Sequence, residues 1–106
     1  MEFNENTDGK VYHVDLDGTL TNGERFWREE PTPRLPVVNA LIGLYKKGNI
    51  IIIWTARQWK HAPETVGWLI KHSIPFHGIY MGKGGSDAYI DDKSVSIDEF
   101  VRLGGL

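Results

Sequence analysis

The sequence VDLDGTL, at residues 14–20, decides how this chain is expected to fold. It closes a short apolar run, residues 11–16, that is bounded by polar residues and is too short for a helix, so it favours a buried strand. Two carboxylates, Asp15 and Asp17, stand at the end of that strand, and Gly18 permits a tight turn after them. Ligands of open α/β sheets bind beyond the carboxyl ends of strands, so the stretch predicts a strand and one wall of a site.

Three further apolar runs are predicted as buried strands, at residues 50–54, 76–81 and 88–90. Between the predicted strands, apolar residues repeat at the spacing of a helix. Pro36 opens a helix that Gly48 ends, Pro63 opens a second, and the capping-box spacing of Ser96 and Glu99 starts a third. The alternation predicts one α/β domain over residues 1–106, with a mainly parallel, Rossmann-like sheet and helices on its faces. Residues 1–9 are expected to be a polar lead-in, and residues 21–33 a short flap.

Composition narrows the functional classes. The 106 residues amount to 12.0 kDa, and the absence of cysteine excludes disulfides, cysteine-based zinc sites and thiol nucleophiles. A net charge of −2 gives no electrostatic argument for binding nucleic acid or a membrane. The longest apolar run is far shorter than a membrane span, and the polar N-terminus is unlike a signal peptide, so we expect a cytoplasmic protein.

Polar side chains follow all four predicted strands. They are Asp15 and Asp17, then Thr55 and Arg57, then Lys83, and finally Asp91 and Asp92. Four converging carboxylates would repel one another unless a cation lay among them, and a set of oxygen ligands favours Mg²⁺. Lys83 and the Thr55 hydroxyl add donors for an anion, and the backbone near Gly18 can form an anion-binding nest. This combination of groups is suited to phosphoryl transfer.

The same residues resemble the four motifs of the haloacid dehalogenase-like (HAD) phosphohydrolases. VDLDGTL at residues 14–20, IIIWTAR at 51–57, Lys83, and YIDD at 89–92 follow one another in the family's order. The resemblance implies a three-layer HAD-type domain. It also implies that Asp15 is the nucleophile, that Asp17 is the general acid and base, and that Thr55 and Lys83 hold the phosphoryl oxygens. Mg²⁺ would be bound by Asp15, the backbone carbonyl of Asp17 and one or both of Asp91 and Asp92.

A finer resemblance, carried by GKGGSDAYIDDK at residues 82–93, is to small HAD phosphatases of capsule and lipopolysaccharide biosynthesis. It implies a small phosphomonoester substrate such as a sugar phosphate, although Gly84 stands where those proteins often have proline. Only 15 residues separate Leu20 from Pro36, so no cap domain is expected. An open site of this kind is compatible with a homo-oligomer. The substrate-binding candidates are Gly18, Thr19, Arg25, Trp27 and Arg57.

Other interpretations of these residues stay open. Arg57 can bind substrate or pair with a carboxylate. The acidic cluster, threonine and lysine also occur in phospho-accepting receiver domains, but there the acidic pair comes first along the chain. A non-catalytic binding protein on the same fold and a phosphatase of nucleic-acid ends are further alternatives; the acidic charge balance argues against the latter.

Overall fold

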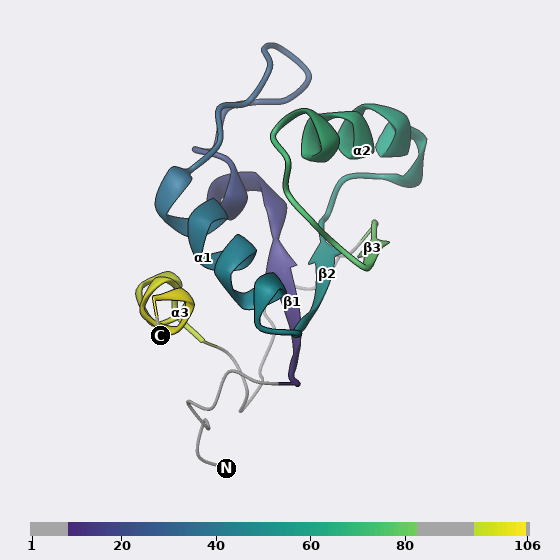
Figure 1. The fold of residues 1–106 in the computed structure, drawn as a ribbon. Coiled ribbons are helices and arrows are strands. Elements are labelled where there is room, and N and C mark those ends of the chain that lie inside the picture. Colours follow the sequence, from purple (N-terminus) through teal and green to yellow (C-terminus); the bar gives the residue numbers. More distant parts are fainter. Residues whose placement is uncertain (1–8, 83–94, 106) are drawn as a thin grey trace.

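The computed structural model describes residues 9–82 and 95–105, and contains a parallel sheet of three strands in the order β1–β2–β3 (Figure 1). The strands are β1 (Val11–Asp15), β2 (Ile50–Trp54) and β3 (Gly78–Tyr80). Asp15 is paired with Trp54, and Trp54 with Tyr80, so the three strands end side by side. This parallel register brings the polar residues that follow β1 and β2 to one edge of the sheet.

Strand β3 is shorter than the predicted run of residues 76–81 because a side chain replaces part of its backbone pairing. The backbone N–H of Ile51 donates to Nδ1 of His77 (3.0 Å), and the N–H of His77 donates to the Ile51 carbonyl (2.8 Å). The imidazole thus satisfies a β2 donor that a strand partner would otherwise take. The predicted second strand has the observed bounds, and the first ends one residue earlier than expected.

The helices begin close to the residues that the sequence indicates. They are α1 (Leu35–Lys46), α2 (Ala62–Lys71) and α3 (Ile97–Gly104). Pro36 and Pro63 both lie in first turns, where the missing N–H costs no hydrogen bond. Ser96 caps α3 by accepting a bond from the Glu99 N–H (3.2 Å), which confirms the predicted cap.

The core lies between these helices and one face of the sheet. Tyr12, Val14, Ile51 and Ile53 alternate onto that face and are buried. They form a cluster with α1 and α2 residues, namely Val37, Val38, Leu41, Leu44, Trp68 and Leu69. Helix α3 packs closely against α1 (Figure 1). The opposite sheet face carries more exposed side chains, among them Val11 and Tyr80.

The arrangement is therefore a small α/β fold with a parallel sheet, consistent with the Rossmann-like prediction. The expected third layer stays a prediction, and the predicted strand at residues 88–90 lies outside the described residues. The flap, residues 21–33, is closed at its base by a bridge between Thr21 and Pro33. None of the described helices is long and apolar enough to cross a bilayer.

Candidate functional site

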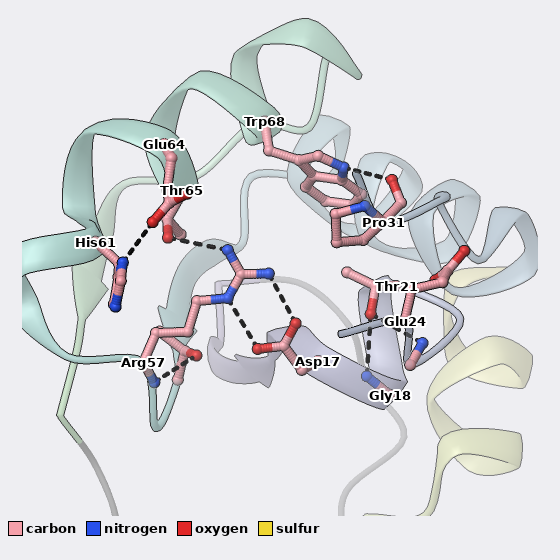
Figure 2. Close-up of polar contacts among 12 residues, drawn as sticks. Asp17, Gly18, Thr21, Glu24, Pro31, Arg57, His61, Glu64, Thr65 and Trp68 are labelled. Carbon is pink, nitrogen blue, oxygen red and sulfur yellow. Dashed lines mark hydrogen bonds and ion pairs between the residues drawn. The ribbon is translucent and has the colours of Figure 1, made fainter. Parts of the chain in front are cut away.

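The turn η1 (Leu16–Leu20) places Asp15 and Asp17 at the carboxyl end of β1. Asp17 is extended, with φ −71° and ψ 125°, and Gly18 has a positive φ of 79°, which only glycine adopts at little cost. The Thr21 N–H donates to the Leu16 carbonyl (3.0 Å) and closes the turn. The Gly18 N–H is used inside the turn, because it donates to Oγ1 of Thr21 (3.1 Å; Figure 2).

Asp15 and Thr19 meet within this turn. The Thr19 hydroxyl lies 3.4 Å from Oδ2 of Asp15 and donates to it. Asp15 is half-buried, so its carboxylate is neither enclosed in the core nor fully exposed to solvent. The turn thus orients one carboxylate through a neighbouring hydroxyl, as a nucleophile or a metal ligand requires.

Thr55 stands at the matching position after β2 and is almost completely buried. Its N–H donates to the Tyr80 carbonyl (2.9 Å), and its hydroxyl accepts the N–H of Arg57 (3.2 Å). No other residue in the described ranges 9–82 and 95–105 accepts the proton of this hydroxyl. Thr55 therefore belongs to the same edge of the sheet as Asp15.

Arg57 contacts three parts of the molecule: the turn after β1, helix α2 and the flap. Figure 2 shows the first two of these contacts. Its Nε and Nη2 donate to the two carboxylate oxygens of Asp17 at 2.9 and 2.7 Å. Its Nη1 donates to Oγ1 of Thr65 in α2 (3.1 Å), and its Cζ lies 3.9 Å from the ring centroid of Phe26 in the flap. The Arg57 side chain is only 3% exposed, whereas that of Asp17 is 35% exposed. In this structure Arg57 pairs with a carboxylate, which is one of the two roles that the sequence left open.

The flap lies against α2 through one buried hydrogen bond and one exposed ion pair. The indole N–H of Trp68 donates to the Pro31 carbonyl (2.8 Å), and Lys71 pairs with Glu30 (2.7 Å). Hydrogen bonding to Lys71, followed by its positive charge, holds the pKa of Glu30 below its usual range.

A second carboxylate, Glu24, stabilises the flap from within. It accepts the backbone N–H of Thr32 (3.0 Å) and also the Thr32 hydroxyl. These bonds, the hydroxyl's first among them, lower the pKa of the Glu24 carboxyl.

A pocket of about 520 Å³ lies between the flap and α2. Phe26, Trp27, Arg57 and Trp68 contribute to its walls. Trp27 is 66% exposed, and Arg25 is also exposed. The two flap residues expected to bind substrate therefore stand on the accessible surface near the pocket.

The described residues bring Asp15, Asp17, Thr19, Thr55 and Arg57 to one edge of the sheet. Lys83, Asp91 and Asp92 lie outside the described residues, so their predicted roles stay predictions. Within residues 9–82 and 95–105, no three His, Cys, Asp or Glu side chains form a group that could hold a metal ion.

Sequence reasoning missed the contacts that Thr65 and Phe26 make with Arg57. Thr65 is a buried polar residue on an otherwise apolar helix face, and this is the signal that could have indicated a partner.

No protein-family model matches the sequence, and no curated protein matches it. Similar solved structures include a chain of the Pnkp1/Rnl/Hen1 complex, which is 24% identical with a TM-score of 0.63. That match covers 82% of this chain but only 32% of the other, and it shows the fold alone.

The crystal structure of a structural-genomics target from Vibrio cholerae is more similar. It is 34% identical with a TM-score of 0.70, and the match covers 91% of this chain and 97% of that one. Because this identity extends over nearly the whole of both proteins, the chain belongs to the same family as this Vibrio cholerae protein.

Proposed function

We propose that this protein is a Mg²⁺-dependent phosphomonoester hydrolase of the HAD type, acting through a phospho-aspartate on Asp15. One observation carries the proposal: Asp15 ends β1 and Asp17 follows it, beside Thr55 and Arg57, which follow the parallel neighbour β2. The three-layer HAD domain is part of the same proposal.

In the first half-reaction, a carboxylate oxygen of Asp15 attacks phosphorus and the bond from phosphorus to the leaving oxygen breaks. Asp17 donates a proton to that oxygen. In the second, Asp17 takes a proton from water as the water attacks phosphorus, the acyl phosphate bond breaks, and inorganic phosphate leaves. Thr55 would donate its hydroxyl to a phosphoryl oxygen, and Lys83 would add a second donor.

The donor set is suited to a hard cation. The groups of η1 that reach this edge are carboxylate, hydroxyl and carbonyl oxygens, which Mg²⁺ prefers. Asp15 and the backbone carbonyl of Asp17 would hold the ion, with Asp91 or Asp92 completing the set. When bound, the ion would offset the charge of a phosphate approaching a carboxylate.

The substrate in this proposal is a small phosphorylated metabolite, with a sugar phosphate as the first candidate. The flap is short, its Arg25 and Trp27 are exposed, and Trp27 lines the pocket beside α2. A pocket of about 520 Å³ is of the size that holds a small molecule.

The test is phosphate release from sugar phosphates, nucleotides, an oligonucleotide with a terminal phosphate and p-nitrophenyl phosphate, with Mg²⁺ and with EDTA. The Asp15→Asn variant is the control. We expect release that needs Mg²⁺ and is lost in the variant. Preference for the oligonucleotide, with strong salt dependence, would support the alternative phosphatase of nucleic-acid ends. No release from any ester by a folded chain would contradict the proposal and favour a binding or receiver-like role.

A further inference from the structure

The buried guanidinium of Arg57 faces a carboxylate and leaves the outer side of that carboxylate open. Both oxygens of Asp17 accept from Arg57, at 2.9 and 2.7 Å. A carboxylate has about four acceptor positions, two on each oxygen, so a bidentate pair leaves others for a reacting group. The exposed fractions of the two side chains are consistent with this, because Asp17 is partly exposed to solvent whereas Arg57 is buried. Arg57 therefore fixes the plane of the Asp17 carboxylate without blocking it.

Two further contacts prevent the guanidinium from turning. Thr65 of α2 is completely buried, and its Oγ1 accepts a hydrogen bond from Nη1 of Arg57 (3.1 Å). Phe26 covers the guanidinium with its ring at 3.9 Å, a cation–π contact made by the flap. A lysine could not reproduce this arrangement, because its ammonium lacks the planar fork that contacts two oxygens at once.

We propose that Arg57 is a positioning residue that orients Asp17 toward the leaving group, and that Phe26 ties this orientation to the flap. The inference rests on the proposed phosphatase function and adds a role for a flap side chain. When the flap lies against α2, the ring holds the guanidinium, and the guanidinium holds the carboxylate. A flap moved away from α2 would leave Asp17 less well oriented.

The test compares two esters that both carry an aromatic ring but differ in their need for an acid. p-Nitrophenyl phosphate has a stable leaving group that departs without a proton, whereas benzyl phosphate releases an alkoxide that requires one. The variants are Phe26→Leu, which keeps apolar volume but removes the ring, and Arg57→Lys, which keeps the charge but removes the fork. Phe100→Leu is the matched control, since the Phe100 ring lies near Tyr12, away from the flap.

We expect kcat/KM for benzyl phosphate, which reports the first half-reaction alone, to fall by roughly 10- to 100-fold in Arg57→Lys, and less in Phe26→Leu. The kcat/KM for p-nitrophenyl phosphate should fall by no more than about threefold, because the acid contributes little to the departure of that leaving group. Phe100→Leu should leave the ratio of the two rates unchanged. In an Asp17→Asn background, Phe26→Leu should not lower the benzyl rate further, because its effect passes through Asp17.

Other outcomes separate the two proposals. An unmodified chain that hydrolyses neither ester would refute the phosphatase function itself. An active chain in which Phe26→Leu and Arg57→Lys lower both rates equally, or neither rate, would overturn the positioning role. So would an unmodified chain that cleaves the aryl ester but not the benzyl ester, since no acid would then be in place. Phe26→Leu also guards against misfolding, because it removes no hydrogen bond.

Discussion

The indole N–H of Trp68 donates to the backbone carbonyl of Pro31 across 2.8 Å, and so joins helix α2 to the flap. Both residues are buried, although most of the flap around Pro31 is exposed. The bond therefore anchors this part of a polar loop to the core (Figure 2). Since the flap also supplies Phe26 to Arg57, this anchor bears on the site as well as on stability.

Replacing Trp68 by phenylalanine tests the anchor. The change leaves the buried Pro31 carbonyl without its donor, so the free energy of unfolding should fall by about 1–3 kcal/mol. Urea unfolding measures the loss, and faster proteolytic cleavage within residues 21–33 reports the loosened flap. Trp59→Phe, at an exposed indole, should change stability by no more than about 0.5 kcal/mol. Equal cleavage rates for both variants would show that the bond does not hold the flap.

The variant Asp15→Asn should lose turnover while it keeps its fold. Turnover should fall by several orders of magnitude, because an amide cannot attack phosphorus as a carboxylate does. The Thr19 hydroxyl can still donate to the amide oxygen, so the turn should be kept. Circular dichroism should therefore show the same secondary structure in the variant as in the unmodified chain. Asp98→Asn, on the exposed face of α3, is the matched control and should retain turnover. Substantial turnover by Asp15→Asn would exclude Asp15 as nucleophile.

Acid should loosen the flap through Glu24. Hydrogen bonds from Thr32 lower the pKa of Glu24 in the closed flap, so the open form takes up a proton more readily. The stabilisation is present above the ordinary glutamate pKa of about 4.3 and is lost as pH falls through the lower pKa of the closed form. The NMR signal of the Trp27 indole N–H should shift over this acidic range. Glu24→Gln should remove much of this pH-dependent shift. Glu30→Gln is the control, and the shift caused by protonation of Glu24 should persist in it. A shift that persists unchanged in Glu24→Gln would assign it to another group.

Helices α1 and α3 approach so closely that position 104 accepts only glycine. A Cβ added to Gly104 would lie 2.3 Å from both Cα and Cβ of Ala40, too close for any side-chain adjustment to relieve. Gly104→Ala should therefore destabilise the protein by about 1–3 kcal/mol, or displace α3. At Gly105 the nearest atom to an added Cβ is 3.5 Å away, so Gly105→Ala is a matched control that should be tolerated. Circular dichroism melts distinguish the two, and similar melting temperatures would contradict the close approach.

Tyr12 carries a buried hydroxyl that has no hydrogen-bond partner among the described residues. Burial also raises the pKa of this phenol. Tyr12→Phe keeps the ring next to Phe100 and removes the unsatisfied group, so stability should stay equal or rise by about 1 kcal/mol. Chemical denaturation provides the measurement. A clear loss of stability would indicate that the hydroxyl has a partner after all.

The strands and helices were largely predictable because local signals mark them. Prolines open α1 and α2, Ser96 caps α3, and a run of four isoleucines becomes β2. The residue at which β3 begins was not predictable, because the ring of His77, rather than a backbone carbonyl, accepts the hydrogen bond from the Ile51 N–H. No sequence pattern indicates that a histidine will accept a strand hydrogen bond.

The sequence predicted which residues meet at the candidate site, but not which of their side chains contact one another. Asp15, Asp17 and Thr55 follow strands, and parallel strands end at one edge, so their proximity follows from topology. The choice between substrate and carboxylate for Arg57 depends on a residue 40 positions away. Its contact with Phe26 depends on the path of a flap that has no periodic pattern. Such contacts are set by tertiary packing, which the sequence pattern does not encode locally.

The parallel pairing of β1 with β2 also has a consequence for a chain that is being synthesised. Asp17 leaves the ribosome 40 residues before Arg57, and Thr65, which holds the guanidinium, follows 8 residues later still. A nascent chain that ends before Arg57 thus has its two aspartates but lacks both the cation that pairs with Asp17 and the helix that holds this cation. Because β1 can pair with β2 only after Ile50–Trp54 has emerged, this edge of the sheet forms late in synthesis.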